Sequence, residues 1–363
     1  MIPRFKRIAI KIGSNVLTRK DGRLDKERIS SLTRQIAALH KAGIEIIMIS
    51  SGAVASGKNE IKPQQKLDTV SARQLFSAVG QSKLINHYYK LFHNHKIVVG
   101  QVLTTKENFS SRRHYLNMKN CINVMVANRV IPIVNENDTI SITELMFTDN
   151  DELSGLIATM MDMEALIILS NIDGIYDGAP DNPASKVIRE IGNCKQDLSS
   201  CIQSTKSSFG RGGMLTKCHI AQKVADEGIE VIIANGKKDN ILIELLSEEH
   251  YSDTVCTRFL PQKKVSGIKK WIAHSEDFAK GHVYINDGAR KALLGENATS
   301  LLPIGITRIE GTFVKDDIIR ISDEQGTLIG IGKAAYDSKK AIEQIGKKGS
   351  KPLVHYDYLY LET

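Results

Sequence analysis

Val134-Asn135-Glu136-Asn137-Asp138 is the stretch that decides the fold, and Asp149-Asn150-Asp151 follows it eleven residues later. The apolar run 130–134 is typical of a buried strand in a parallel sheet. The acids and amides would therefore lie at the carboxyl end of that strand, where open α/β sheets bind ligands. Carboxylates and carboxamides suit an ammonium group, a bound Mg²⁺ or a nearby lysine. The stretch predicts a site for a small amine-bearing substrate or a metal nucleotide.

The second acidic stretch also has a purely structural interpretation. Asp149, Asn150 and Asp151 would cap the helix that the apolar spacing over residues 153–160 predicts, because acids are common in a first helical turn. Capping uses only one or two of these side chains. It also leaves Asn135 and Asp138 without an explanation.

Apolar runs alternate with helical spacing along the first part of the chain. Between the runs, apolar residues recur every three or four positions, as in Ile29, Leu32, Ile36 and Leu39. This alternation predicts an α/β fold, a three-layer αβα sandwich with a mainly parallel central sheet. The predicted strands are Ile8–Ile12, Ile44–Ile49, Ile97–Val102, Val130–Val134, Leu166–Leu169 and Glu230–Ala234.

The pattern changes near residue 272, where short strand-like runs and turns replace the helical spacing. A chain of 363 residues is also longer than one ordinary domain. We therefore expect a first domain over residues 1–257, a linker over 258–271 and a small β-rich domain over 272–363. The predicted strands of the second domain are His282–Ile285, Ile304–Ile309, Ile318–Ile321 and Leu328–Ile331.

Composition argues against several classes of protein. No long apolar region follows the charged first residues, so we expect no signal peptide, and no stretch of about 18 uncharged apolar residues could span a bilayer. The five cysteines have no C-x-x-C spacing, which argues against a disulfide framework or a zinc site. We expect a cytoplasmic protein that has no metal site built from its own side chains.

The net charge of +8 raises the question of nucleic-acid binding. Lys and Arg outnumber Asp and Glu by 37 to 28 over residues 1–274, whereas residues 275–363 hold 12 basic and 13 acidic residues. The basic excess is therefore absent from the second domain, and part of it crowds the expected linker. We do not expect this protein to bind nucleic acid.

Two lysines near glycines could neutralise phosphate groups. Lys11 lies in the first apolar run just before Gly13, so its ammonium group must find an anion or emerge at the strand end. Lys217 follows three glycines among four residues, 210–213, whose backbone N–H groups could wrap phosphates, although the run is not a Walker A loop. Each signal alone is weak, because Lys11 could extend to the surface and the glycine run could be a plain surface loop.

Together, the lysines and the acid and amide cluster suit phosphoryl transfer. That reaction depends on positioning and charge neutralisation, and a carboxylate acceptor with a pKa of about 4.3 is already ionised at neutral pH. A general base is then unnecessary. This agrees with ten histidines that are scattered along the chain without an obvious catalytic one.

In order along the chain, these motifs resemble those of the amino acid kinase family, and within it the glutamate 5-kinases that carry a carboxyl-terminal PUA domain. The resemblance covers nearly the whole chain. Each glycine motif is weak alone, but the ordered set is highly specific. The matching segments are 9–14, 50–53, 78–81, 134–138, 149–151, 212–214 with Lys217, and 300–305.

The resemblance implies ATP-dependent phosphorylation of the γ-carboxylate of L-glutamate to γ-glutamyl phosphate, the first step of proline biosynthesis. Lys11 and Lys217 would neutralise the transferring phosphoryl group, and Asp151 would orient both lysines. Asp138 would pair with the ammonium group of glutamate. The residues implied to hold glutamate are Ser51, Asn135, Asp138, Asp149 and Asn150.

The resemblance also implies a nucleotide site and several partners. Mg²⁺ would accompany ATP and bridge its phosphates. The acyl phosphate product hydrolyses readily, which implies transient contact with glutamyl phosphate reductase. Family members commonly form homo-oligomers and are inhibited by proline. The residues implied to bind ATP are Lys11, Gly13, Ser170, Asn171, Arg211, Gly212, Gly213, Met214, Leu215, Thr216 and Lys217.

The chain departs from the family pattern at two places in the implied nucleotide site. The family usually has Thr-Asp where this chain has Ser170-Asn171, and Asp-Pro where it has Ala179-Pro180. A carboxylate is lost at each place. We therefore expect the contacts to ribose and adenine, and with them nucleotide preference or affinity, to differ.

Two alternative functions remain at this point. N-acetylglutamate kinase is the nearest enzymatic alternative, but Asp138 would gain nothing from an acetamide in place of an ammonium group. The PUA resemblance, from Val283 to Tyr336, raises RNA binding as an alternative from another class, because PUA domains in other proteins bind RNA through a basic face. The second domain has a net charge of −1, so we expect a structural or regulatory role for it.

Overall fold

The computed structural model describes residues 3–141, 147, 150–179, 182, 184–192, 214–262, 267–273, 275–295 and 299–361. The chain divides into two compact units, Met1–Asn108 with Arg113–Lys264, and Phe109–Arg112 with Val265–Thr363. Each unit contains its own cluster of buried apolar side chains. Among the described residues, no helix combines the length and apolar character needed to cross a membrane.

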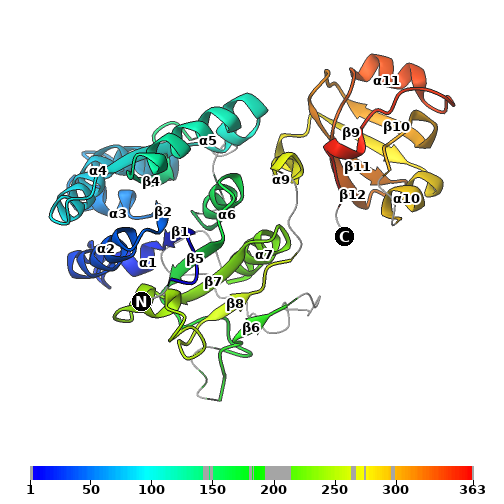
Figure 1. Ribbon diagram of the computed structural model, residues 1–363. Helices are drawn as coiled ribbons and strands as arrows, with labels where there is room; N and C mark the ends of the chain where they lie inside the picture. Colours follow the sequence, from blue (N-terminus) through cyan, green and yellow to red (C-terminus); the bar gives the residue numbers. More distant parts are fainter. Residues whose placement is uncertain are drawn as a thin grey trace. The chain divides into compact units, whose positions relative to one another are not determined.

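An eight-stranded sheet forms the centre of the first unit (Figure 1). Its strands are β1 (Arg7–Ile12), β2 (Glu45–Ser50), β3 (Val99–Thr104), β4 (Ile131–Glu136), β5 (Ala165–Ser170), β6 (Glu190–Ile191), β7 (Glu230–Asn235) and β8 (Thr257–Phe259). Their order is β3-β4-β2-β1-β5-β7-β8-β6. The first six strands in this order run parallel, and only the β7–β8 pair is antiparallel. The predicted mainly parallel sheet is confirmed.

All six strands predicted for this unit form, with small differences at their ends. The largest consequence is in β4, which continues through Asn135 to Glu136 instead of ending at Val134. The first polar residues of the quoted stretch therefore belong to the strand itself. The sequence analysis missed β6 and β8, which have only two and three residues.

Helices cover both faces of the sheet, which confirms the three layers (Figure 1). They are α1 (Ser14–Leu17), α2 (Lys26–Lys41), α3 (Ala53–Lys58), α4 (Thr69–His93), η1 (Lys106–Phe109), α5 (Arg112–Ala127), α6 (Asn150–Met160), α7 (Met214–Asp226) and α8 (Ile241–Leu246). Apolar residues of α2, α4 and α8 share one core cluster with Ile8, Ile10 and Ile12 of β1. Side chains alternate along a strand, so Lys11 faces the opposite layer, where α6 packs against β1.

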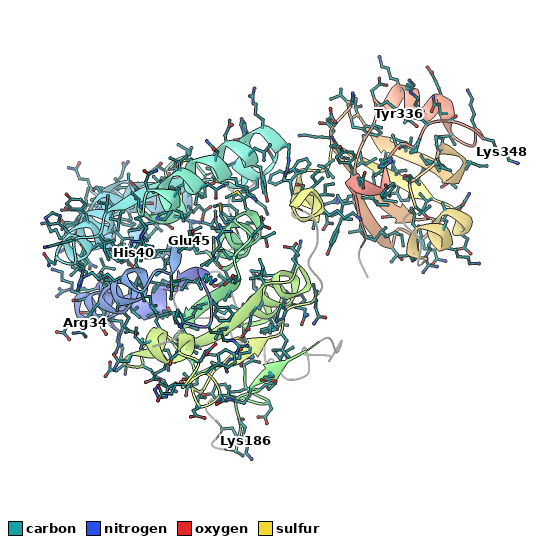
Figure 2. The ribbon with its side chains drawn as sticks, viewed as in Figure 1. Arg34, His40, Glu45, Lys186, Tyr336 and Lys348 are labelled. Carbon is teal, nitrogen blue, oxygen red and sulfur yellow. The ribbon has the colours of Figure 1, made fainter. Side chains whose placement is uncertain are left out.

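The second helix illustrates how the sequence specifies these layers. Asp25 caps α2 by accepting a hydrogen bond of 3.1 Å from the backbone N–H of Arg28. The predicted apolar stripe, from Ile29 to Leu39, is buried against the sheet. Arg34 lies on the opposite side of the helix and is exposed (Figure 2). The helix is therefore amphipathic in the way its spacing predicts.

A close helix contact lies behind the turn that follows β2. A Cβ atom added to Gly80 of α4 would lie 1.9 Å from the backbone oxygen of Ala53 in α3, and one added to Gly57 of α3 would lie 1.8 Å from that of Phe76 in α4. Only glycine permits this approach. Gly52, which precedes α3, has a φ of 109°, a conformation that also favours glycine. These glycines fix α4 beside the loop that contains Ser51.

The second unit is built around a five-stranded sheet of order β10-β9-β11-β12-β13. The strands are β9 (Gly281–Ile285), β10 (Ile306–Gly311), β11 (Ile318–Asp323), β12 (Leu328–Lys333) and β13 (Leu359–Leu361). The four strands predicted for this domain form, and the β-rich character is confirmed. Its other elements are α9 (Gly267–Ala273), η3 (Glu276–Phe278), α10 (Asp287–Leu294), η4 (Pro303–Gly305), α11 (Ser338–Gln344) and η5 (Tyr356–Tyr358).

The segment expected to be a linker contains regular structure at both ends. Arg258 and Phe259 lie in β8, where they pair with β7 and β6. Helix α9 begins at Gly267. Arg258 is buried because its guanidinium stacks on the ring of Tyr251, so it is not a solvated connector charge.

Candidate active site

Asp151 lies between two lysines that come from distant parts of the sequence. Its carboxylate accepts a hydrogen bond of 2.6 Å from Lys217 Nζ through Oδ2 and forms an ion pair with Lys11 Nζ through Oδ1. Lys11 is in β1, Asp151 is in the first turn of α6, and Lys217 is in the first turn of α7. The structure thus brings together the three residues expected to be catalytic, and we call them the lysine cluster.

The lysine cluster is buried and carries a net positive charge. The side chains of Lys11, Lys217 and Asp151 are 6%, 13% and 0% exposed. Burial raises the pKa of the Asp151 carboxyl, but the charges of Lys11 and Lys217 outweigh burial and hold that pKa below its usual range. The carboxylate is therefore ionised at neutral pH. Two ammonium groups against one carboxylate leave one positive charge, which suits an anionic group.

Gly13 leaves space beside the lysine cluster. Its N–H donates to the oxygen of Leu169 at 3.1 Å, which joins the end of β1 to β5. A Cβ atom at this position would lie 3.1 Å from that oxygen and 3.6 Å from Lys11 Nζ. A side chain at this position would therefore crowd the backbone oxygen at the end of β5 and contact Lys11 Nζ.

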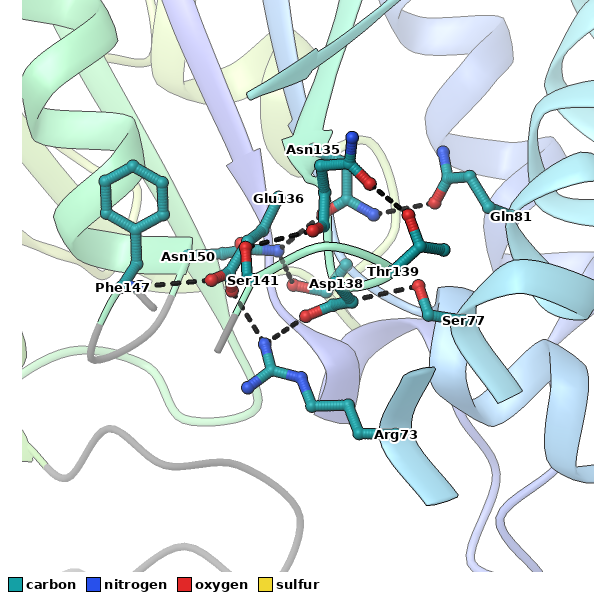
Figure 3. A network of polar contacts seen from close by, with 12 residues as sticks. Arg73, Ser77, Gln81, Asn135, Glu136, Asp138, Thr139, Ser141, Phe147 and Asn150 are labelled. Carbon is teal, nitrogen blue, oxygen red and sulfur yellow. Dashed lines mark hydrogen bonds and ion pairs between the residues drawn. The ribbon is translucent and has the colours of Figure 1, made fainter. Parts of the chain in front are cut away.

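A second group, which we call the amide cluster, contains Ser51, Gln81, Asn135 and Asn150, of which Figure 3 labels the last three. Asn150 Nδ2 donates to Ser51 Oγ at 2.9 Å and to Asn135 Oδ1 at 3.1 Å. Asn135 Nδ2 donates to Gln81 Oε1 at 2.9 Å. The loop after β2, the end of β4, the start of α6 and the middle of α4 therefore meet here. Three of the residues expected to bind the substrate glutamate, namely Ser51, Asn135 and Asn150, are in this cluster. Gln81 was not among the expected residues.

Asp138 lies in a third group with Arg73 and Glu136, which we call the carboxylate triad (Figure 3). Arg73 Nη2 contacts Glu136 Oε2 at 2.6 Å and also forms an ion pair with Asp138 Oδ1. Ser77 Oγ donates to Asp138 Oδ2 at 3.3 Å, and the N–H of Phe147 donates to Glu136 Oε1 at 3.0 Å. One guanidinium therefore serves two buried carboxylates.

The carboxylate triad is electrostatically the reverse of the lysine cluster. Burial raises the pKa of Glu136, and the negative charge of Asp138 adds to this effect, whereas Arg73 opposes it without cancelling it. With both carboxylates ionised, the triad carries one negative charge. It therefore suits a cationic group such as an ammonium.

The sequence analysis did not single out Arg73, Ser77 or Glu136 as functional residues. A signal for them was present in α4, where Arg73, Ser77 and Gln81 recur at intervals of four residues and so share one face of the helix. All three contact the polar stretch that opens the sequence analysis. A polar stripe on a long helix was the observation that could have predicted them.

The expected nucleotide residues are partly described. Ser170 is buried at the end of β5, Asn171 is exposed after it, and Met214, Leu215 and Thr216 form the half-buried first turn of α7 with Lys217. Asp149, Arg211, Gly212 and Gly213 lie outside the described residues.

A further polar group lies at the carboxyl ends of β5 and β7. Asn235 Nδ2 donates to Asp173 Oδ1 at 2.9 Å, and Lys238 Nζ contacts the same oxygen at 3.0 Å. The N–H of Gly236 donates to the oxygen of Ser170 at 2.8 Å. Asp173 therefore places a carboxylate two residues after Asn171, where the family carboxylate is lost.

The described residues offer no cluster of three or more His, Cys, Asp or Glu side chains that could hold a metal ion. Both carboxylate oxygens of Asp151 face lysine ammonium groups. A divalent cation would therefore fit this site better as a companion of nucleotide phosphates than as a ligand of these side chains.

Comparisons with known proteins identify the family of both parts of the chain. Residues 6–235 match the model of the amino acid kinase family, and residues 281–356 match that of the PUA domain. The chain is 69% identical to the glutamate 5-kinase of Bacteroides thetaiotaomicron over 359 residues, which cover 99% of each chain. It is 48% identical to the glutamate 5-kinase of Chlorobaculum tepidum over 360 residues, which cover 99% of this chain and 98% of the relative.

A solved structure of UMP kinase from Bacillus anthracis is 15% identical in sequence, with a TM-score of 0.49. The match covers 72% of this chain and 98% of the UMP kinase chain. That likeness adds no weight to the assignment, which depends on the family models and the full-length relatives. The chain therefore belongs to the amino acid kinase family, among the glutamate 5-kinases, and ends in a PUA domain.

Proposed function

We propose that this protein transfers the γ-phosphoryl group of ATP to the γ-carboxylate of L-glutamate and so forms γ-glutamyl phosphate for proline biosynthesis. The observation that carries the proposal is the position of Asn150 and Asp151. These neighbours at the start of α6 belong to the amide cluster and to the positive lysine cluster, respectively. An acceptor held by the first would meet a phosphoryl group held by the second.

In this proposal the lysine cluster stabilises the transferring group. Lys11 and Lys217 neutralise the negative charge that is shared between the donor and acceptor oxygens, and Asp151 holds both ammonium groups in place. The γ-carboxylate is ionised at neutral pH and attacks without a general base. The water-poor surroundings strengthen each of these interactions.

Glutamate binding is assigned to the amide cluster and the carboxylate triad. Ser51, Asn135 and Asn150 present hydroxyl and amide groups that can exchange their mutual hydrogen bonds for bonds to the substrate. Asp138 pairs with the α-ammonium group, and Asp149 is a further candidate. The negative charge of the triad supports this assignment.

ATP is proposed to bind along Gly13, Ser170, Asn171 and the segment from Arg211 to Lys217, with Mg²⁺ carried by its phosphates. When bound, Mg²⁺ would supply further neutralisation of phosphate charge. The carboxylate of Asp173 is a candidate for a ribose contact in place of the one lost at Asn171. The N–H groups in the first turn of α7 favour an anion, as helix N-termini do.

The remaining expectations also stay proposals. We propose a cytoplasmic homo-oligomer that is inhibited by proline and passes its unstable product to glutamyl phosphate reductase. We propose a catalytic domain near residues 1–257, a connecting segment near 258–271 and a PUA domain near 272–363. The two compact units and the two family matches support this division.

An acyl phosphate trap tests the proposed function. The protein is incubated with ATP, Mg²⁺, hydroxylamine and either glutamate or N-acetylglutamate, and hydroxamate is measured. We expect hydroxamate with glutamate only. Hydroxamate formed only from the acetylated substrate, or from neither, would refute the proposal. Replacing Mg²⁺ by EDTA should abolish the signal.

A further inference from the structure

Arg73 lies at the glutamate end of the proposed site, although no motif of the sequence points to it. Its side chain is 19% exposed, and its partners Glu136 and Asp138 are 3% and 7% exposed. In the part of the chain that the structure describes, Arg73 and Asp138 are the charged groups that act on Glu136. Arg73 therefore supplies a positive charge that reduces the repulsion between the two buried carboxylates.

Two neighbouring buried carboxylates do not both stay ionised without such a cation. The repulsion between them raises the pKa of one, so that it takes up a proton more readily than an isolated carboxylate. A proton on either carboxyl of a coupled pair is shared between the two. Loss of Arg73 would therefore leave Asp138 uncharged for part of the time, and an uncharged Asp138 binds an ammonium group weakly.

The orientation of Asp138 is also set by α4. Arg73 contacts Oδ1 and Ser77 donates to Oδ2, and these two residues lie one helical turn apart. The same helix holds Asn135 through Gln81. The polar stripe of α4 thus fixes the carboxylate and the amide that face the proposed substrate.

We propose that Arg73 is a positioning residue that keeps Asp138 ionised and oriented for the α-ammonium group of glutamate, and that Glu136 balances the charge of Arg73 so that the triad stays negative. Arg73 compensates one of the two carboxylates, and the triad retains the single negative charge that the ammonium group neutralises. The inference rests on the proposed function. It adds to that function the groups that select an amine-bearing acceptor.

Steady-state kinetics of Arg73→Met test the role of Arg73. We expect the KM for glutamate to rise about 10- to 100-fold. The reason is that the hydrogen bond between the ammonium group and an ionised Asp138 is worth about that factor in affinity. The KM for ATP and kcat should stay within about threefold. Arg73→Lys keeps the charge without the planar fork and should recover part of the affinity. Lys83→Met is the matched control, since it removes a cation from an exposed ion pair on the same helix.

The pH dependence separates an electrostatic role from loss of packing. In Arg73→Met, the glutamate KM should rise further as the pH falls, because loss of the guanidinium raises the pKa of the coupled carboxylates and the pair then takes up a proton more readily. The wild-type KM should change less. A glutamate KM that stays at the wild-type value, or one that rises equally at all pH values and is not improved in Arg73→Lys, would overturn the proposal.

Removal of one carboxylate provides an independent check. In the double variant Arg73→Met/Glu136→Gln, Asp138 no longer shares its surroundings with a second carboxylate, so the glutamate KM should fall at least threefold below that of Arg73→Met. A KM equal to or above that of the single variant would refute the coupled triad. If Arg73→Met does not fold, Glu136→Gln alone should raise the glutamate KM about threefold to tenfold, because Arg73 then neutralises Asp138. An unchanged KM would contradict the proposal.

These results are distinguishable from failure of the proposed function. Wild-type protein that forms no hydroxamate from glutamate would refute the proposed function itself. An active wild type whose glutamate KM is insensitive to both substitutions would refute only the roles of Arg73 and Glu136.

Discussion

The lysine cluster and the carboxylate triad have opposite net charges but the same arrangement, in which one charged side chain lies between two of the opposite sign. In the first, Asp151 lies between Lys11 and Lys217, and in the second, Arg73 lies between Glu136 and Asp138. Each group is buried, and each keeps one unit of charge uncompensated by its own members. The difference in sign shows how one sheet edge can hold a phosphoryl group at one end of an acceptor and an ammonium group at the other.

The central residue of the lysine cluster should matter most. Asp151→Asn removes the carboxylate that two buried ammonium groups share and should lower the free energy of unfolding by about 3–5 kcal/mol at pH 7. Denaturant unfolding measures this. Asp239→Asn, which weakens an exposed ion pair with Arg28, should change it by no more than about 1 kcal/mol. Equal stabilities would mean that the cluster does not depend on Asp151.

The pH dependence of stability should follow the same residue. The pKa of Asp151 is lower in the folded protein than in the unfolded chain, so its contribution is fully present above the unfolded value of about 4 and is lost as the pH falls below it. Wild type should therefore lose stability on acidification more steeply than Asp151→Asn. Parallel curves would contradict the lowered pKa.

The cation on α7 should affect turnover more than substrate binding. We expect Lys217→Ala to lower kcat about 100- to 1,000-fold, the cost of removing one group that stabilises developing charge, with the glutamate KM within about threefold. Hydroxamate kinetics measure both values. The exposed Lys186 provides the control, and Lys186→Ala should behave as wild type (Figure 2). An unchanged kcat would refute the role of Lys217.

The triad should show the opposite kinetic pattern. Asp138→Asn removes the proposed ammonium partner and should raise the glutamate KM about 10- to 100-fold, while kcat at saturation changes by less than about fivefold. If kcat falls as steeply as in Lys217→Ala and the KM does not change, the division of labour between the two charge groups is wrong.

The smallest expected effect concerns the helix contact that supports the glutamate end alone. Gly80→Ala must push α4 away from α3 and should cost about 1–3 kcal/mol of stability. The glutamate KM should rise while the KM for ATP does not. Gly192→Ala is the control, because a Cβ atom there meets none of the described residues within 4 Å. Equal changes in both KM values would show that the two ends are not supported separately.

The sequence predicted most of the first unit because the strong patterns are local. A short apolar run such as Ile8–Ile12 is typical of a buried strand, and the stripe from Ile29 to Leu39 is typical of an amphipathic helix. The short strands β6 and β8 could not be predicted, since two or three residues carry no periodicity and form only through pairing with neighbours. The burial of Arg258 could not be predicted either. A charged residue close to Pro261 is typical of an exposed linker, and the contact with the ring of Tyr251 forms only in the fold.

The sequence predicted the lysines of the candidate site and Asp151, but it did not predict the arginine that pairs with the buried carboxylates. Lys11, Asp151 and Lys217 were each marked by a motif, and the structure brings them together. Arg73 was not marked, because an arginine on a long helix is usually solvated. The recurrence of Arg73, Ser77 and Gln81 marked a polar face of the helix, but only the fold shows that Arg73 pairs with Glu136, 63 residues away in sequence.

The start of α6 joins two binding events through consecutive residues. Asn150 and Asp151 are fixed in one helical turn, so a small rotation of that turn displaces both the amide cluster and the lysine cluster. Occupancy of the proposed glutamate site would then be thermodynamically linked to occupancy of the proposed ATP site. The factor by which glutamate changes the affinity for ATP must equal the factor by which ATP changes the affinity for glutamate. One helix terminus would thus make the binding of the two substrates interdependent.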